Sequence, residues 1–449
     1  MDSAEETNPA RPGSNWGRQL MKTPEAQMRR FTLSVTFFVW LGLLALAPAR
    51  AASQSSTRVD TIVRVAQAPV HPGVATLVEE MSIGVADGAE EYMLGDVADI
   101  ALGRDGTMYV LDRQVPAIRQ YDDRGKYLRT IGRSGAGPGE YRSPSGLATM
   151  RDGRLLLWDT GNWRINVYSA DGTTLTQWQT PSGSSGSSSA QFSRALLVDT
   201  AGVVITRKTI FSRDFNNRPT VWVRFRSDGS PIDTIQPLPA PPEGPGLSVA
   251  RGNAWMSIPL PFSPRRVVVM SPLGYLVAGF PDRYAFELHQ PRGPIVSVRR
   301  DMKPEPVSRT EGTEARRGIE ARMREMDPNW SWNGPDIPDT KPLYSDLLVG
   351  LDGRIWIALV PEGGPRIGNT STSMGVGNPG GARRPPPSKE REPSKPALYD
   401  VFEPDGRYLG QVQVPARVSS VVRRGDHVWA VAFDAEDVPR IKRYRITWK

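Results

Sequence analysis

Three histidines are the side chains of this sequence best suited to bind a metal or to act as a general base. They are His71, His289 and His427, and the sequence contains no cysteine. Without cysteine the chain can form no disulfide, no thiolate–metal site and no cysteine nucleophile. We expect His71 in an N-terminal linker and His427 in a hairpin near the C-terminus, so the three imidazoles are not expected to converge on one ion. The sequence therefore predicts no metal and no cofactor.

Asp112 and Asp159 could also take part in chemistry, as calcium ligands or as an acid–base pair. Each ends an apolar run immediately before a predicted turn. Aspartate in such a position accepts hydrogen bonds from backbone N–H groups of the turn. The two residues recur at the spacing of a sequence repeat, which favours this structural role. No Gly-x-Ser-x-Gly elbow follows a predicted strand, so we predict no Ser-His-Asp triad and assign no catalytic residue.

Five residues are candidates for binding a ligand. Arg113, Trp163 and Arg164 lie in or beside the turns that follow Asp112 and Asp159. We expect Arg164 to pair with a carboxylate of its own sheet, with ligand contact as the alternative. Trp330 and Trp332 lie in an insertion, where they either pack the insertion against the body of the protein or form part of a binding rim.

A repeat of 47 residues organises the region that contains these turns. The pairs at this spacing are Gly106 and Gly153, Asp112 and Asp159, Ile118 and Ile165, Tyr121 and Tyr168, and Gly125 and Gly172. Within each copy, short β-rich runs are separated by Asp-Gly turns and leave no room for a crossover helix. Each copy is therefore predicted to be an antiparallel meander of about four strands, and a period of about 40–50 residues is typical of a β-propeller blade.

The second copy, residues 131–172, resembles the NHL repeat. The resemblance rests on Gly137–Tyr141, Pro144–Ala148, Asp152-Gly153, Asn162 and Arg164-Ile165. The first copy matches only in part, because Ala117-Ile118 stands where the repeat has Arg-Ile. The resemblance implies a six-bladed β-propeller of the exported bacterial type. Propellers related to this repeat include lyases and lactonases that use a metal in the central funnel.

The rest of the chain supplies four further blades in this interpretation. The third is Ala195–Asp199, Val203–Arg207, Val221–Arg226 and Ile232–Ile235. The fourth is Trp255–Pro259, Arg265–Met270, Tyr275–Gly279 and Tyr284–His289, followed by Ile295–Val298. The fifth is Ser345–Gly350, Arg354–Val360, Leu398–Glu403 and Tyr408–Val412. The predicted fold is thus all-β, a six-bladed β-propeller of four-stranded antiparallel blades.

The two ends of this predicted ring meet in the sixth blade. Val418–Val422, His427–Phe433 and Arg440–Trp448 supply three strands, and Thr76–Ile83 supplies the outermost one. Such closure removes the sheet edges that would otherwise invite aggregation. We therefore expect a single propeller over residues 76–449, preceded by a linker, residues 52–75, in which Arg58–Val65 forms a half-buried strand.

Three insertions are expected within the ring. Ser182–Ala190 is rich in Gly and Ser and is predicted to be a flexible loop. Residues 302–342, between blades four and five, contain an amphipathic helix over Thr310–Met326, whose apolar side chains Ile319, Met323 and Met326 should lie on the propeller. Residues 361–396 are rich in Gly, Pro and Arg and are predicted to be disordered.

The N-terminal region predicts export. Within residues 1–51, Arg29-Arg30 precede an apolar run from Phe31 to Ala47, and Ala49-Arg50-Ala51 has the form of a signal-peptide cleavage site. We expect cleavage, with no membrane span afterwards and a periplasmic or extracellular monomer. The alternative is that the run of about 17 residues remains as a single transmembrane anchor. The net charge of +8 would suggest nucleic acid in a cytosolic protein. For an exported chain we expect first a generally basic surface, with an anionic envelope ligand or an unknown protein as the alternative partner, and no nucleic acid.

These observations lead to one expected function and one alternative. The expected function is a non-catalytic binding or scaffold module, because no set of catalytic side chains converges in the sequence. The insertion Thr310–Trp332 is the expected contact for a protein partner. The alternative is a metal-assisted lyase or a lactonase-type hydrolase in the central funnel. It requires Asp, Glu, Asn or His side chains gathered near the channel axis, and a floor of apolar or Arg side chains would count against it.

Overall fold

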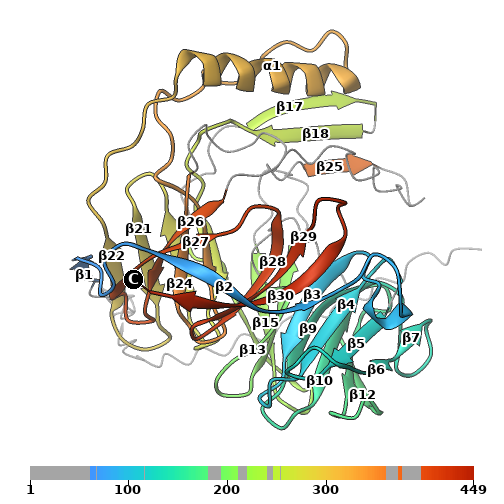
Figure 1. The fold of residues 1–449 in the computed structure, drawn as a ribbon. Helices are drawn as coiled ribbons and strands as arrows, with labels where there is room; N and C mark the ends of the chain where they lie inside the picture. Colours follow the sequence, from blue (N-terminus) through green and yellow to red (C-terminus); the bar gives the residue numbers. More distant parts are fainter. Residues whose placement is uncertain are drawn as a thin grey trace, which may run out of the picture. The chain divides into compact units, whose positions relative to one another are not determined.

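The computed structural model describes residues 61–66, 68–115, 117–180, 194–210, 220–239, 246–252, 254–360, 373–376 and 396–448. Strands account for almost all of the regular structure, with one α-helix (Figure 1). The predicted signal peptide and the predicted loop Ser182–Ala190 lie outside the described residues. No helix among the described residues is long and apolar enough to span a membrane.

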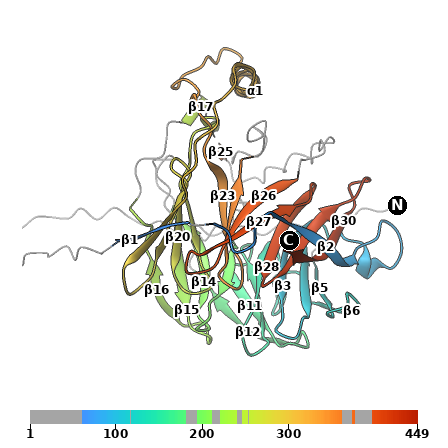
Figure 2. The same ribbon diagram turned by 60° about the vertical axis from the view of Figure 1, so that its left-hand side comes forward.

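The strands of the described residues form six antiparallel blades of four strands each, two of which are joined in one eight-stranded sheet. Figures 1 and 2 label many of these strands in two views. Blade one is β3 (Val97–Leu102), β4 (Met108–Asp112), β5 (Ala117–Tyr121) and β6 (Tyr127–Ile131). Blade two is β9 (Pro144–Thr149), β10 (Leu155–Asp159), β11 (Arg164–Tyr168) and β12 (Thr174–Gln179). Blade three is β13 (Leu196–Val198), β14 (Val204–Thr209), β15 (Thr220–Phe225) and β16 (Pro231–Ile235). The short pair β7 (Arg133–Ser134) and β8 (Glu140–Tyr141) bridges the loop between the first two blades.

The second half of the chain forms the other three blades. Blade four is β19 (Val267–Met270), β20 (Leu276–Phe280), β21 (Ala285–His289) and β22 (Ile295–Arg299). Blade five is β23 (Tyr344–Val349), β24 (Ile355–Leu359), β26 (Ala397–Phe402) and β27 (Tyr408–Val414). Blade six is β28 (Val418–Arg424), β29 (His427–Phe433), β30 (Pro439–Thr447) and β2 (Val74–Ile83), the last from the N-terminal end.

Burial follows the order of the strands within each blade. All five residues of β4 and of β10 are buried, because each of these middle strands is covered on both faces. The outermost strands β6 and β12 are mostly exposed. The Asp-Gly turns that join the strands hold Gly106 and Gly153 at φ of 90° and 88°, a region that Gly enters without steric strain. The apolar clusters therefore lie between blades rather than in one central core.

Hydrogen bonds link each blade to the next and close the ring. Blades one and two are linked by Leu147 N–H, which donates to the Asp99 side chain at 2.8 Å. Blades two and three are linked by Arg194 Nη2, which donates to Leu147 O at 3.0 Å. Blades three and four are linked by Thr200 N–H, which donates to Pro272 O at 2.8 Å. Blades four and five are linked by Leu343 N–H, which donates to Pro281 O at 2.9 Å. Blades five and six are linked by Leu351 N–H, which donates to Arg423 O at 2.7 Å. Blades six and one are linked by Arg424 Nη2, which donates to Leu102 O at 3.0 Å. The protein is thus a closed, six-bladed β-propeller, as predicted.

The sixth blade combines the two ends of the described chain. Strand β2 pairs antiparallel with β30 from Thr76 opposite Thr447 to Ile83 opposite Ile441. It also pairs in parallel with β27 over Val74–Thr76, which joins blades five and six into one eight-stranded sheet. The prediction that an N-terminal strand completes the last blade is confirmed.

The composition of the fourth blade differs from the prediction. The segment expected as its first strand, Trp255–Pro259, belongs instead to a hairpin of β17 (Gly246–Arg251) and β18 (Ala254–Pro259). Strand β18 pairs on its other side with β25 (Ser373–Val376) and not with β19. Ile295–Arg299 is therefore the outermost strand of blade four. A hairpin and a blade strand have the same alternating pattern, so the sequence alone did not distinguish them.

The helical insertion packs on this hairpin. Helix α1 (Arg309–Met326) begins at a capping box in which Ser308 and Glu311 bond each other's backbone N–H groups. Its buried side chains Ile319 and Met323 pack against Leu247 and Ile258 of the hairpin. Figure 1 shows α1 lying along β17 and β18. The predicted helix is present, but it packs on the hairpin, whereas we expected it to pack on the blades.

Two further segments differ from expectation. Strand β1 (Thr61–Val65) is exposed along its whole length, because it adds in parallel to the outer edge of β22 and nothing covers it in the described part of the chain. We expected it to be half-buried.

Strand β25 lies within the segment 361–396 that was expected to be disordered, so part of that segment pairs with a sheet. The rest of that segment, except Pro396, lies outside the described residues.

A buried carboxylate fastens blade four to blade five. Asp400 is fully buried in β26 and accepts hydrogen bonds from the Tyr408 hydroxyl at 2.8 Å and from Gln411 Nε2 at 3.1 Å. The Tyr284 hydroxyl and the Arg300 guanidinium of blade four donate to its other oxygen. A buried carboxylate is stable only when its oxygens are satisfied in this way.

Replacing Asp400 should therefore weaken the whole ring. We expect Asp400→Ala to lower the free energy of unfolding by about 3 kcal/mol, because it leaves Arg300 and two buried hydroxyls without their acceptor. Chemical denaturation measures this loss. Asp301→Ala, at an exposed aspartate nearby, is the matched control and should change stability little. Equal stability of the two variants would contradict the role given to Asp400.

Candidate ligand site in the central channel

The six innermost strands end at one mouth of the central channel. Each blade begins with its innermost strand, so these strands run in one direction and are followed by turns at the same end. In blades one to five the residue before the turn donates its N–H to the fourth residue on, as Gly103 does to Thr107 O at 2.7 Å. The residue immediately after this N–H donor lies at the rim of the channel mouth. In blade six the corresponding residue is Arg424, the last residue of β28. The six rim residues are Arg104, Arg151, Thr200, Pro272, Leu351 and Arg424.

All six rim residues line a single cavity of about 400 Å³. This volume falls within the range of about 300–1,000 Å³ found for sites that bind small molecules. The deeper walls come from the ends of β3, β9 and β13, and they are largely apolar. They comprise Ala101, Leu102, Ala148, Thr149, Met150, Leu196, Leu197, Val198, Arg194 and Asp199. The cavity therefore has apolar walls and arginines at its rim.

Two of the rim arginines have free guanidinium groups. Arg104 and Arg151 are exposed, and within the described part of the chain neither side chain has a hydrogen-bond or ion-pair partner. The aspartates that follow them are engaged elsewhere: Asp105 accepts from the Thr107 hydroxyl at 2.8 Å, and Asp152 pairs with Arg154 at 2.8 Å. Both guanidinium groups can therefore bind a ligand without breaking a protein contact.

Arg194 is held in the channel wall by a network across two blades. Its guanidinium pairs with Asp99 at 3.2 Å and donates to Ile100 O at 2.9 Å, and the Asp99 side chain is only 14% exposed. Burial raises the pKa of Asp99, while Arg194 and the backbone N–H groups of Leu147 and Ile100 oppose that rise. Both carboxylate oxygens of Asp99 are therefore bonded to groups of the channel wall, so Asp99 is not available as a catalytic base.

Arg424 adds a positive charge that is only partly compensated. Its guanidinium donates to Gly103 O at 2.9 Å and to Leu102 O at 3.0 Å, which are neutral acceptors. Burial, and then the positive charge of Arg194, lower the pKa of Arg424, while Asp352 acts in the opposite direction. Two neighbouring cations in a partly dehydrated site favour the binding of an anion.

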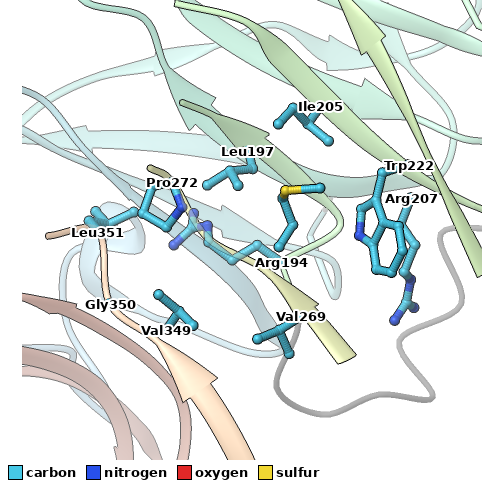
Figure 3. A pocket seen from close by; sticks show the side chains of 11 residues that line it. Arg194, Leu197, Ile205, Arg207, Trp222, Val269, Pro272, Val349, Gly350 and Leu351 are labelled. Atoms are coloured by element: carbon cyan, nitrogen blue, oxygen red, sulfur yellow. The ribbon is translucent and has the colours of Figure 1, made fainter. Parts of the chain in front are cut away.

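A second, smaller cavity of about 30 Å³ adjoins the first. The two share Arg194, Leu197, Pro272 and Leu351. In Figure 3, Trp222 and Arg207 of blade three lie on one side of this alcove, and Pro272 and Leu351 lie on the other. Its space is enough for one water molecule or one methyl group. The channel cavity therefore extends into a small, mostly apolar recess.

A second acidic and basic pair lies on neighbouring inner strands. Asp346 of β23 and Arg423 of β28 interact electrostatically, although they form no close ion pair. Burial raises the pKa of Asp346 from 3.8 to about 7, against the opposing effects of the Leu347 N–H and Arg423. Arg423 is itself 5% exposed and stacks on Trp356 and Tyr399, with its carbon Cζ 4.7 and 5.3 Å from the two ring centroids.

The two repeated aspartates have the structural role that the sequence predicted. Each buried carboxylate accepts three backbone N–H groups from the loops around it. For Asp112 the donors are Gly95, Asp96 and Gln114 at 2.8, 3.0 and 2.9 Å. For Asp159 they are Arg142, Ser143 and Gly161 at 3.1, 2.9 and 3.1 Å. Their oxygens stabilise the turns, as expected from the period of the repeat.

The three binding candidates in these turns are held in different ways. Arg164 donates to carbonyl oxygens of the glycine-rich loop, at 2.6 Å to Gly137 and 2.7 Å to Glu140. The expectation that it pairs with a carboxylate was wrong, because the loop folds its carbonyls around the guanidinium. Arg113 pairs with Asp96 at 3.2 Å. Trp163 is 44% exposed at a φ of 53° and is the candidate most open to solvent.

The other two candidates lie in the insertion. Trp330 is 7% exposed, packs with α1 and the hairpin, and donates from Nε1 to Ser248 O at 2.8 Å. Trp332 lies edge-on to Trp330 and beneath the Arg316 guanidinium. The structure therefore places these tryptophans in the packing of the insertion. The rim of the channel contains none of the five predicted candidates.

The histidines lie apart from the channel. His71 stacks on Trp448, His289 contacts Glu287 at 3.0 Å, and His427 contacts Glu80 at 3.3 Å. Among the residues that the structure describes, no group of three or more His, Cys, Asp or Glu side chains is placed to hold a metal ion.

The channel instead brings together Arg104, Arg151, Arg194 and Arg424, none of which the sequence singled out as a site. Arg104 and Arg151 had one signal, since they recur 47 residues apart immediately before an Asp-Gly turn.

Comparison with known proteins supports the fold. Residues 88–182 match a family model described as a 6-bladed beta-propeller, DUF5128. No curated protein matches the sequence. The prediction of a six-bladed propeller is therefore confirmed by both the strand order and the family match.

Several solved structures are similar to this one at low identity. A Bacteroides fragilis protein described as exported is 12% identical with a TM-score of 0.44, over 86% of this chain and 99% of that one. A DUF4221 family member from Bacteroides vulgatus is 12% identical with a TM-score of 0.48, over 84% and 99%. Virginiamycin B lyase from Staphylococcus aureus is 10% identical with a TM-score of 0.37, over 82% and 99%. Similarity at this level gives no information about the ligand or activity of this chain.

The buried Asp346 generates a prediction about pH. Between pH 4 and pH 7 the unfolded chain has this carboxyl ionised while the folded chain keeps it protonated, so its contribution to stability falls as pH rises. We expect Asp346→Asn to gain stability relative to the unsubstituted chain over this interval, by about 1 kcal/mol per pH unit. Urea denaturation at a series of pH values measures the difference. A difference that does not change with pH would contradict the raised pKa.

Proposed function

We propose that this chain is an exported β-propeller that binds a ligand in its central channel and does not transform it. The observation that carries the proposal is the channel cavity of about 400 Å³ with arginines around its rim. Guanidinium groups donate hydrogen bonds and compensate negative charge, but they remain protonated and so do not act as general bases at ordinary pH. This side-chain set suits recognition better than acid–base chemistry.

The same arginines argue against the alternative of metal-assisted catalysis in this mouth. A divalent cation would meet the positive charges of Arg194 and Arg424 within the channel wall. The carboxylates that could offset them are occupied: Asp99 pairs with Arg194, and Asp199 accepts the N–H groups of Ala201 and Val203, each at 2.8 Å. A cation bound by Asp99 would have to compete with its ion pair to Arg194.

The remaining parts of the proposal rest on the sequence. Export follows from the charged, apolar and small-residue segments within residues 28–51. An anionic envelope ligand agrees with the net charge of +8. A protein partner on the helical insertion has less support, because Trp330 packs against the β17–β18 hairpin and Trp332 donates to Pro335 O within the insertion.

Native mass spectrometry can test binding without turnover. The full chain is mixed with the low-molecular-weight fraction of a cell-envelope extract, and the bound species is weighed before and after release. We expect a bound small molecule that leaves with its mass unchanged. Release of a species with an altered mass would show chemistry and contradict the proposal, and so would the failure of any small molecule to bind.

The metal alternative has its own measurement. A protein that uses a metal site gains thermal stability when the ion is added, in proportion to the logarithm of its concentration above Kd. We expect the melting temperature of the dialysed chain to be unchanged by Zn²⁺, Ca²⁺ or Mg²⁺. A rise that grows with the logarithm of the concentration of one of these ions, together with turnover in the extract, would favour the lyase or hydrolase alternative.

A further inference from the structure

The cationic residues of the channel rim are confined to one half of the ring. Blades six, one and two place Arg424, Arg104 and Arg151 at the rim. Blades three, four and five place Thr200, Pro272 and Leu351 at the positions opposite. We call the three arginines the arginine crescent. Because the blades are consecutive around the ring, the mouth has one charged side and one uncharged side.

No ion pair neutralises the arginine crescent among the described residues. Arg104 and Arg151 have no partner among the described residues, and Arg424 donates to two backbone carbonyls. The nearest acidic lining residue, Asp199, is 8% exposed and its oxygen Oδ1 accepts two backbone N–H groups. Three cations at one rim, of which only Arg424 is partly compensated by Asp352, attract an anion. Arginine binds carboxylate and phosphate oxygens in paired hydrogen bonds.

The uncharged half of the rim suits a different part of the same ligand. Pro272 and Leu351 continue inward to Leu197 and to the alcove lined by Met270 and Trp222. An apolar group placed against these side chains would leave water and gain the usual free energy of burial. The channel cavity also has a limited volume, so it can hold a small molecule or the end of a chain but not a folded polymer.

Building on the proposed function, we propose that the channel mouth binds a small amphipathic anion. Its carboxylate or phosphate head lies on Arg104, Arg151 and Arg424, and its apolar portion lies against Pro272 and Leu351. Arg194, held by Asp99 and by the carbonyls of Ile100 and Leu147, is a positioning residue that forms the wall between the mouth and the alcove.

Calorimetric titration with four probes tests both halves of this site. The probes are hexyl phosphate, hexanoate, inorganic phosphate and hexan-1-ol, so that head group and apolar tail are varied separately. We expect hexyl phosphate or hexanoate to bind more tightly than inorganic phosphate and than hexan-1-ol, and the tighter of the two to identify the head group. Equal binding of inorganic phosphate would contradict the apolar half, and equal binding of hexan-1-ol would contradict the charged half.

Substitutions then locate the site. We expect Arg104→Ala with Arg151→Ala to weaken the better amphipathic probe by at least about tenfold, since each removes charged hydrogen bonds to the head group. The fold should tolerate both changes, because both side chains are exposed and neither has a hydrogen-bond or ion-pair partner in the described part of the chain. Arg124→Ala is the matched control: this arginine is exposed in the turn between β5 and β6 and does not line the cavity, so binding should be unchanged.

Leu351→Asn probes the opposite side of the rim. It should weaken the amphipathic probes several-fold and leave inorganic phosphate unaffected. If the probes bind equally well to the arginine variants and the unsubstituted chain, the arginine crescent is not the site, whereas the proposed function still stands on the extract experiment. If no probe binds at millimolar concentration, the amphipathic anion is the wrong ligand class, and the extract experiment again decides the proposed function separately.

Discussion

The fold depends on closing the ring, and the closure is made by one strand from the beginning of the described chain. Without β2, the last blade would present the free edge of β30, and open edges of this kind pair with other chains. Pairing from Thr76–Thr447 to Ile83–Ile441 completes the sixth blade with a strand that leads along the chain into the first blade. The six innermost strands then surround one channel in a common direction, so the residues that follow them meet at a single mouth.

This constraint explains why the candidate site lies where it does. Blade turns that are far apart in the sequence, such as Arg104 and Arg424, line one cavity only because the ring is closed. Hydrogen bonds between neighbouring inner strands hold their backbones in place, and Arg194 with Asp99 adds a link across the channel wall. The rim can therefore vary in residue type from blade to blade while its geometry stays fixed. Charged rim residues on three blades and uncharged rim residues on the other three are such a variation.

The sequence predicted much of the fold because blades repeat. Asp112 and Asp159 showed the period, and their recurrence correctly indicated a structural role. The sequence wrongly predicts β18 as a strand of blade four, because alternation of apolar residues does not reveal which strand pairs with which. The site was harder to predict, since Arg104, Arg151 and Arg424 become neighbours only through the closure of the ring. A lone arginine before a turn has the same appearance as any solvated side chain.

The most direct test of this account is to locate an anion in the molecule. Crystals of the full chain soaked with tungstate, an oxyanion of similar shape to phosphate, would reveal its position by anomalous scattering. The account predicts a strong peak in the channel mouth, within hydrogen-bonding distance of Arg104, Arg151 and Arg424. Tungstate bound only at other surface arginines, with an empty mouth, would contradict the claim that the propeller channel is built to receive an anion.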